Sequence, residues 1–383
     1  MQTRILGIES SCDETAAAVV SDGLEVLSNV VASQIDIHKK YGGVVPELAS
    51  REHLRQIVPV VREAVAQAKM QLAELDAIAV TQGPGLVGAL LVGITYGKTL
   101  AAALKKPLIA VNHLEGHVQA VFLEAHRAGR KVKFPAVCLI VSGGHTVLYE
   151  VTEVRIGTAE DFKSLSYRKM GQTRDDAAGE AYDKVAKLLA LGYPGGPILD
   201  RLAVASNAAG NGERNNAAPP VRFGPTKMRG NALDFSFSGL KTAVLYHLRE
   251  HPEYSEDIGV RQAALERGDN TFEKLLPLCD GQTLALIREF QRSVVRTLVE
   301  QTMTAAESIS AESVLVSGGV AANSELRTAF EKRAGSSSME VFFPSRALST
   351  DNAAMIAAAA YSRFRAGVLA DASLNPDPAL ILR

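Results

Sequence analysis

Residues 4–23 read RILGIESSCDETAAAVVSDG, an apolar run, a polar turn and a second apolar run. Short apolar runs on either side of a tight polar turn are typical of two strands joined in a hairpin. Residues 136–151, AVCLIVSGGHTVLYEV, repeat this layout with the turn SGGH in place of SSCDET. The repetition predicts two related domains, each of which begins with a strand hairpin.

Strands alternate with helices over the rest of the chain. Apolar, strand-like runs at residues 76–82, 107–112 and 313–319 lie between segments with helical periodicity. This alternation is typical of α/β units. We predict helices from residue 113 to a stop at Gly129, over 177–192, from about Asn323, and over the Ala-rich stretch 352–367.

Length and composition exclude several classes of protein. The chain has 383 residues, of which 47% are hydrophobic and 22% charged, enough for two or three domains with apolar cores. These figures exclude collagen-like, disordered and disulfide-scaffold chains. We predict a first domain over 1–125 plus 352–383, and a second over 126–351 with an exposed Asn-, Gly- and Pro-rich excursion at about 205–231.

The chain has the features of a cytoplasmic protein without a membrane anchor. Cys12, Cys138 and Cys279 are odd in number and widely spaced, which is typical of reduced thiols in the cytosol. The first apolar run is too short for a signal peptide, and no stretch reaches about 18 uninterrupted apolar residues. Because the net charge is −1, any nucleic-acid site has to be a local patch.

The stretch HLEGH places His113 and His117 four residues apart, so both imidazoles project from one face of a helix. This is a spacing of metal ligands, although two histidines at chance spacing on the surface or in the core are an alternative. The pair flanks the apolar stripe of the helix rather than lying in it. The zinc-protease pattern H-E-x-x-H is absent, because Glu115 follows His113 by two residues.

Two histidines need a third, anionic ligand, and Asp351 is a candidate. It precedes the Ala-rich helix, beside Asn352. An aspartate in this position is also an ordinary N-cap, which accepts hydrogen bonds from the first turn of a helix. Periodicity alone favours the cap over the ligand.

Three loops are candidates for phosphate binding: the two hairpin turns and SGGVAAN (317–323). Successive N–H groups of such loops cradle phosphates, although each loop by itself is also an ordinary tight turn. Together they fit a nucleotide bound between two domains. QGPGLVG (82–88) contains G-x-G-x-x-G, but the next strand ends in Asn112 rather than an acidic residue, so we reject a dinucleotide site.

Two further stretches carry concentrated charge. The acidic run DDAAGEAYDK (175–184) opens a helix, where the dipole favours it, and Asp183 with Lys187 has the spacing of a plain surface pair. Solvated loops and a footprint on a phosphate backbone explain the basic residues equally well. These basic residues are Lys163, Arg168, Lys169 and Arg174 in one cluster, and Arg222, Lys227 and Arg229 in the other.

Read together, nine stretches resemble the universal tRNA threonylcarbamoyltransferase family (the TsaD type), once described as glycoproteases. They run in order from residue 8 to residue 355 and so cover nearly the whole chain. The sequence departs from the family in a basic excursion at 163–174 and a lengthened segment at 209–231. The stretches are IESSCDET, YGGVVPELASREH, GPGLVGALLVG, NHLEGH, LIVSGGHT, DDAAGEAYDKVAKLLALGYPGGPILD, FSFSGLKT, SGGVAAN and TDNAAM.

The resemblance implies a two-domain actin/Hsp70/sugar-kinase-like (ASKHA) fold with a duplicated α/β core and a nucleotide cleft between the domains. It implies an enzyme that transfers the threonylcarbamoyl group from threonylcarbamoyl-AMP to the exocyclic amine of the adenosine 3′ of the tRNA anticodon. The implied partners are tRNA, an inactive paralogue subunit and a small ATPase subunit.

The resemblance also implies the residues of the site. His113, His117 and Asp351 are the implied metal ligands, and such a set favours Fe(II), with Zn(II) as the alternative. His145, beside the glycine turn, is a candidate for proton transfer. The implied substrate contacts are Ile140, Val141, Ser142, Gly143, Gly144, Asp183, Gly196, Asp200 and Asn323.

Two other functions compete with this interpretation. A sugar kinase or ATPase of the same fold resembles D-x-G-[ST] in its phosphate hairpins, whereas the turns here read SSCDET and SGGH. A non-catalytic, nucleotide-dependent binding module would not need HLEGH together with Asp351. A metalloprotease is disfavoured, because the general base of its motif is missing.

Overall fold

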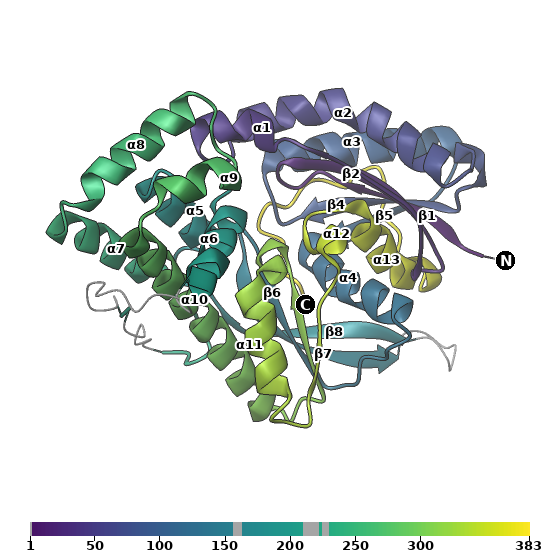
Figure 1. Ribbon diagram of the computed structural model, residues 1–383. Helices are drawn as coiled ribbons and strands as arrows, with labels where there is room; N and C mark the ends of the chain where they lie inside the picture. Colours follow the sequence, from purple (N-terminus) through teal and green to yellow (C-terminus); the bar gives the residue numbers. More distant parts are fainter. Residues whose placement is uncertain (1, 156–162, 210–221, 224–229) are drawn as a thin grey trace.

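The computed structural model describes residues 2–155, 163–209, 222–223 and 230–383. Its strands form two five-stranded sheets, in the orders β3-β2-β1-β4-β5 and β10-β9-β6-β7-β8. In Figure 1 the first sheet lies in the upper right and the second lies below it.

The first sheet begins with the first hairpin of the sequence. β1 and β2 pair antiparallel, as do β2 and β3, whereas β1 with β4 and β4 with β5 are parallel pairs. The strands are β1 (Arg4–Glu9), β2 (Glu14–Ser21), β3 (Glu25–Ser33), β4 (Ala77–Gly83) and β5 (Leu108–Asn112).

The second sheet repeats this arrangement. β6, β7 and β8 form an antiparallel meander, and β9 and β10 continue the sheet in parallel from β6. The duplicated α/β core predicted from the two hairpins is therefore confirmed. The strands are β6 (Ala136–Val141), β7 (Thr146–Arg155), β8 (Lys163–Gln172), β9 (Ser313–Ser317) and β10 (Glu340–Phe342).

Helices cover both faces of the first sheet, because alternate side chains of a strand point to opposite faces. One face packs against α2 and α3, and the other against α4 and α13. α13 runs close to β1, since a Cβ on Gly7 would lie 2.4 Å from the carbonyl oxygen of Ala353. Glycine is therefore required at residue 7, because the backbone of α13 lies directly against the strand. The helices are α1 (Ile35–His38), α2 (Pro46–Gln67), α3 (Val87–Leu104), α4 (His113–Arg127) and α13 (Ala353–Arg365).

One face of the second sheet packs against α5, α6, α10 and α11, around the largest apolar cluster of the protein. The remaining helices connect these or lie at the periphery. The helices that the structure describes in this part of the chain are α5 (Ala178–Leu188), α6 (Gly195–Ala209), α7 (Ser238–Glu250), α8 (Tyr254–Glu266), α9 (Phe272–Leu275), α10 (Gly281–Ser308), α11 (Ser324–Ala334) and α12 (Arg346–Ser349). Short 3-10 turns lie at Lys39–Tyr41, Leu72–Glu74, Leu276–Leu278 and Gly319–Ala322.

Helix α4 lies between the two sheets. Ala120 and Leu123 belong to the apolar cluster of the first sheet, whereas Leu114, Val118 and Val121 belong to a cluster with β6, β7 and β9 of the second. The helix that begins with HLEGH is thus held from both sides.

Two predictions of secondary structure are wrong, one about the end of a helix and one about a loop. Helix α5 ends at Leu188 rather than at Gly192, because the chain turns at Ala190, whose φ is 52°. The basic stretch from Lys163 is not a loop but strand β8, which pairs with β7 along its length. Strand formation there depends on residues outside the stretch, since β7 supplies the ladder of hydrogen bonds and Asn231 and Phe235 bind the end of the strand.

The predicted excursion at 205–231 is partly helical. Helix α6 continues to Ala209 and so takes up its beginning. Residues 210–221 and 224–229, which include Lys227 and Arg229, lie outside the described residues.

The three cysteines carry free thiols. Cys138 and Cys279 are buried, and burial raises the pKa of both. In folded protein both thiols therefore stay protonated near neutral pH.

Among the described helices, α3 (Val87–Leu104) is long and apolar enough to cross a membrane by length and composition. It packs along β4 and α2, and its Lys98 ammonium donates to the carbonyl oxygen of Leu374, 2.9 Å away. A core helix of a water-soluble protein has the same composition, so this helix is weak evidence for a membrane span.

Candidate functional site

The first histidine of HLEGH is also the first residue of α4. Asn112 ends β5 and caps the helix, because its Oδ1 accepts a hydrogen bond of 2.9 Å from the amide of Leu114. His113 and His117 then lie one turn apart, with ring centroids separated by 4.8 Å. Their exposed fractions are 4% and 0%. Both are therefore buried, while Leu114 and Val118 of the same helix belong to the apolar cluster of the second sheet.

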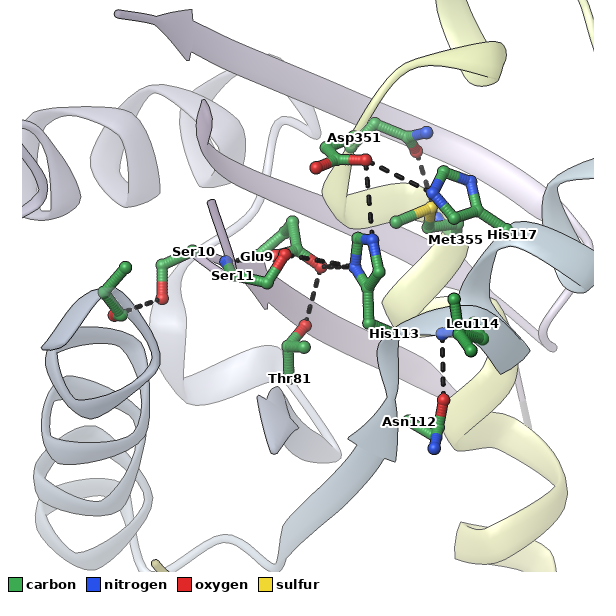
Figure 2. A network of polar contacts seen from close by, with 12 residues as sticks. Glu9, Ser10, Ser11, Thr81, Asn112, His113, Leu114, His117, Asp351 and Met355 are labelled. Atoms are coloured by element: carbon green, nitrogen blue, oxygen red, sulfur yellow. Dashed lines mark hydrogen bonds and ion pairs between the residues drawn. The ribbon is translucent and has the colours of Figure 1, made fainter. Parts of the chain in front are cut away.

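Asp351 meets both imidazoles from the chain that precedes α13. Its Oδ1 lies 3.6 Å from Nε2 of His113 and 3.2 Å from Nε2 of His117 (Figure 2). The ligand atoms of the three side chains all lie within 4.8 Å of one another, and no other such group occurs in the part of the chain that the structure describes.

Asp351 does not cap the helix, so the interpretation that periodicity favoured is wrong. Asn352 is the cap, and its Oδ1 accepts from the amide of Met355 at 3.1 Å. A single-residue difference in cap position leaves the Asp351 carboxylate free to face the histidines. Periodicity could not distinguish these neighbours, because both residue types are good caps.

The imidazolium and the carboxylates of this cluster stabilise one another's charged forms. Burial disfavours the imidazolium of His113, but the carboxylates of Asp351 and Glu9 outweigh it and raise the pKa of His113 to about 9. Burial likewise opposes ionisation of Asp351, yet His113 and His117 hold its pKa below the ordinary range. A buried anion beside two imidazoles suits a cation.

Glu9, at the end of β1, completes the polar network but was not among the residues predicted. Its Oε2 accepts from Nδ1 of His113 at 3.0 Å and from the hydroxyl of Thr81 at 2.8 Å, and its Oε1 accepts from the amide of Ser11 at 2.5 Å (Figure 2). The signal in the sequence was a single carboxylate closing an otherwise apolar strand, RILGIE.

The donor set fits a bound metal ion. Two imidazole nitrogens and one carboxylate oxygen converge, and these are ligands that Fe(II) and Zn(II) accept. Among the described residues, the imidazole of His117 has no hydrogen-bond partner on either nitrogen, although Nε2 lies 3.2 Å from Oδ1 of Asp351. A buried imidazole without partners is costly, and a metal ion bound at Nε2 would relieve part of that cost.

Glu115 and Gly116 serve the packing of α4 rather than the site. The Glu115 carboxylate accepts from the guanidinium of Arg363 at 2.6 Å, away from both histidines. A Cβ on Gly116 would lie 2.9 Å from Ile356 of α13, so the close approach at this glycine is made by another helix. Glu115 is therefore no general base, as the spacing predicted.

The second hairpin turn, between β6 and β7, is open. A Cβ on Gly143 or Gly144 would meet no atom within 4 Å. The amide of Ser142 donates to the carbonyl oxygen of His145 and closes the turn. By contrast, Ile140 and Val141 are fully buried in the apolar clusters on opposite faces of the sheet, so their side chains cannot reach a ligand.

His145 lies at the junction of the turn and the buried cluster. Its ring centroid is 6.1 Å from that of His113. Burial, with His113 and His117 adding to it, lowers the pKa of His145 to about 4. The imidazole is therefore neutral near pH 7 and can accept a proton.

Asp183 faces the start of α6 rather than Lys187. Its Oδ1 accepts from the amide of Gly195 at 2.7 Å. Burial raises the pKa of Asp183 to about 6, against the effect of that hydrogen bond and together with the charge of Asp13. The proposed surface pair with Lys187 is not formed. Gly196, next in the chain, has open space at its Cα.

Asp200 and Asn323 meet in a second polar network around Gln291 of α10. Asn323 caps α11 through its Oδ1 and donates to Oε1 of Gln291 at 2.9 Å. The amide nitrogen of Gln291 donates to Asp200 at 3.2 Å, and Ser324 donates to Asp200 through both its amide and its hydroxyl. Gln291, fully buried, was missed, since nothing local distinguishes it on a long helix.

Two residues of the basic stretch 163–174, Arg168 on β8 and Arg174 just after it, are paired within the protein. Arg168 donates to Glu150 on β7 at 2.6 Å, and Arg174 donates to Asp234 at 2.6 Å. Lys169 donates to Gln172, while Arg222 is exposed. The ion pairs favour a solvated sheet edge over a phosphate footprint for the first cluster.

The chain resembles proteins of one family over its whole length. A family model described as tRNA N6-adenosine threonylcarbamoyltransferase matches residues 25–358. A protein of that name from Koribacter versatilis is 54% identical over 390 residues, covering 99% of both chains. Another, from Anaeromyxobacter sp. (strain Fw109-5), is 49% identical over 378 residues, covering 98% of this chain and 99% of the relative.

Among solved structures, the crystal structure of HypF from T. kodakarensis matches with a TM-score of 0.51 at 12% identity. The match covers 97% of this chain and 49% of that one. At such low identity the likeness concerns the fold alone. The fold is the duplicated α/β architecture shared by actin, Hsp70 and the sugar kinases, as expected.

Proposed function

This chain belongs to the tRNA N6-adenosine threonylcarbamoyltransferase family and is a transferase, and on that premise we propose which residues carry its reaction. The reaction transfers a threonylcarbamoyl group from threonylcarbamoyl-AMP to the exocyclic amine of the adenosine 3′ of the tRNA anticodon and releases AMP. A sugar-kinase or binding-module activity is not favoured by this membership.

The observation that carries the assignment of the site is the convergence of His113, His117 and Asp351 from two distant segments. We assign these residues as ligands of one divalent cation, Fe(II) in the first place and Zn(II) as the alternative. The bound ion would supply a Lewis acid for the carbamoyl carbonyl. With the ion bound, both imidazoles would be neutral ligands, and Asp351 would contribute the negative charge.

The open turn at Ser142, Gly143 and Gly144 is assigned to the phosphate of the adenylate. Its backbone amides are the available donors, since the two glycines have no side chain in the way. The side chains of Ile140 and Val141 are buried, so any contribution of these residues comes from the backbone.

We assign Asp183, Gly196, Asp200 and Asn323 to the nucleoside and threonyl end of the substrate. Asp183 is the best acceptor for a ribose or threonine hydroxyl, because among the described residues a single hydrogen bond, from the amide of Gly195, engages its carboxylate. Gly196 leaves room for close approach. Asp200 and Asn323 are already held by hydrogen bonds to Gln291, so they would form a fixed side of the binding site.

His145 is assigned to proton transfer. As the amine nitrogen bonds to the carbamoyl carbon, the bond to the phosphate oxygen breaks and AMP leaves with the electron pair. The nitrogen then carries an extra proton, which the neutral imidazole of His145 accepts. A lowered pKa keeps this base unprotonated near pH 7.

Further assignments follow from the family resemblance. tRNA is the acceptor substrate, and the enzyme works in the cytoplasm with an inactive paralogue and a small ATPase. We place one domain at 1–125 plus 352–383 and the other at 126–351, since α13 packs on the first sheet while β6 to β10 form the second.

Mass spectrometry of tRNA nucleosides tests the activity. Incubation of the protein and its partner subunits with tRNA and threonylcarbamoyl-AMP should produce threonylcarbamoyladenosine. Unmodified adenosine after incubation of the complete mixture would contradict the assignment.

Metal analysis tests the site. Wild-type protein should carry about one metal ion per chain, and the His113→Ala, His117→Ala double variant should carry none. His126→Ala is the matched control, because His126 lies exposed in the last turn of the same helix. Full occupancy in the double variant would show that the ion binds elsewhere.

A further inference from the structure

We propose that Glu9 is a positioning residue that fixes the tautomer and the ring orientation of His113, so that Nε2 is presented to the metal. The inference rests on the proposed metal centre and extends it to a residue on another strand. Glu9 and His113 are 104 residues apart in the chain and meet only in the folded protein.

The carboxylate of Glu9 can only accept hydrogen bonds once it is ionised. The structure surrounds it with donors: the hydroxyl of Thr81 and the amide of Ser11 take up two of its positions. Its contact of 3.0 Å with Nδ1 of His113 therefore requires a proton on Nδ1. Nε2 is then left to face Asp351 (Figure 2).

The hydroxyl of Ser11 supports the same orientation. Its oxygen lies 3.2 Å from Nδ1 of His113, on the side away from Asp351. Ser11 is itself fixed by Glu9 through its amide. The first hairpin turn thus holds one side of the imidazole and leaves the other for the metal.

His117 provides the contrast within the same cluster. Its Nδ1 is buried and has no hydrogen-bond partner in the part of the chain that the structure describes. The two ligands are therefore unequal, and a carboxylate supports only His113 among them.

The environment of Glu9 argues against a purely structural role. The side chain is 0% exposed, and among the residues that the structure describes its hydrogen-bond partners include neither lysine nor arginine. Burial of an ionised carboxylate is costly unless it is paired. The imidazole of His113, and through it a bound cation, is the positive group that compensates for this burial.

The test compares metal affinities by zinc titration against a chromophoric chelator. Glu9→Gln keeps the shape and an acceptor but offers an N–H to Nδ1, which favours a proton on Nε2. The expected loss is about 10–100-fold in zinc affinity, the usual effect of an outer-shell partner. Thr81→Val is the matched control, because it removes a donor to the same carboxylate and leaves His113 untouched.

The ring proton provides a second readout that a merely structural role would not change. In zinc-loaded wild-type protein, the imidazole spectrum of His113 should show a slowly exchanging proton on Nδ1. This signal should be lost in Glu9→Gln and kept in Thr81→Val.

Wild-type zinc affinity in a folded Glu9→Gln variant, with the Nδ1 proton retained, overturns the inference while leaving the metal centre in place. Should Glu9→Gln fail to fold, Glu9→Asp serves instead, since its carboxylate is one methylene too short to reach Nδ1 of His113. Undiminished zinc affinity in Glu9→Asp also overturns the inference. Wild-type protein that binds no zinc and no iron contradicts the proposed centre itself, a distinguishable result.

Discussion

The two hairpin turns have the same topology but opposite surroundings. The first, Ser10 to Asp13, is enclosed: the Ser10 hydroxyl donates to Ala89 on α3, and the buried ring of His53 on α2 donates to the carbonyl oxygen of Cys12. The second, at residues 142–145, exposes two glycines with open space around them.

The difference shows how a duplicated unit can be divided between two tasks. The first turn is filled by protein and connects through Glu9 to the buried metal ligand His113. The second turn leaves its amides to a ligand. A common strand pairing therefore fixes the backbone, while the side chains packed on each turn decide what that turn can bind.

The largest effect is expected from a methyl group placed against the enclosed turn, at Gly85 after β4. A Cβ on Gly85 would lie 2.5 Å from the carbonyl oxygen of Ser11, and the φ of Gly85 is 158°. Gly85→Ala should therefore reduce the free energy of unfolding by about 2–4 kcal/mol, as overpacking and strain do. Chemical denaturation measures this.

Gly143→Ala is the matched control in the open turn. Because a Cβ there meets no atom within 4 Å, the free energy of unfolding should change by no more than about 0.5 kcal/mol. Equal destabilisation by the two substitutions would contradict the contrast between the turns.

A larger side chain in the open turn should affect the ligand rather than the fold. AMP at about 100 times its Kd should stabilise the wild type by about 2.7 kcal/mol. Gly143→Val should lose this stabilisation, since the branched side chain blocks approach to the amides. Thermal unfolding with and without AMP measures the loss, and an unchanged shift in Gly143→Val would place the nucleotide elsewhere.

The raised pKa of Asp183, to which the charge of Asp13 in the first turn contributes, should make the stability of the protein depend on pH. The pKa of Asp183 is raised to about 6, so between about pH 4 and 6 the native state keeps a proton that the unfolded state has lost. The contribution of this group to stability is present below pH 4 and is lost as pH rises through 6. The loss is about 1–3 kcal/mol.

Denaturant titrations at pH 4 and pH 7 check this contribution. Asp183→Asn should remove this contribution from the difference between the free energies of unfolding at pH 4 and pH 7. Asp13→Asn should reduce the contribution, because the charge of Asp13 in the first turn helps to raise the pKa of Asp183. An identical pH dependence in wild type and Asp183→Asn would contradict it.

The smallest effect is expected at the edge of the second sheet. Arg168 is paired with Glu150, so Arg168→Ala should change the salt slope of tRNA binding by less than the value of about 0.7–0.9 that one phosphate contact gives. Filter binding at several salt concentrations measures the slope. A decrease as large as one contact would place β8 on the tRNA.

Local patterns determined much of this fold. The two hairpins, the helix that starts at His113 and the Ala-rich helix all follow from short-range alternation, periodicity and capping residues. The spacing of His113 and His117 fixed their common face before any packing was known, because one helical turn separates them.

Tertiary structure decided what local patterns leave open. The same sequence signal makes Asp351 and Asn352 equally good caps, and only the position of α13 against β1 turns one of them toward the histidines. The same holds for the strand at Lys163–Gln172, which exists because β7 lies beside it.

The sequence by itself determined the duplicated α/β plan and the pair of histidines, since both arise from residues close together in the chain. Burial of those histidines, the carboxylates of Glu9 and Asp351 on either side of His113, and the opposite surroundings of the two turns were decided by tertiary structure alone. The physical reason is that hydrogen bonds, charge pairs and close contacts depend on distances in space, and a linear pattern encodes only the distances within one element.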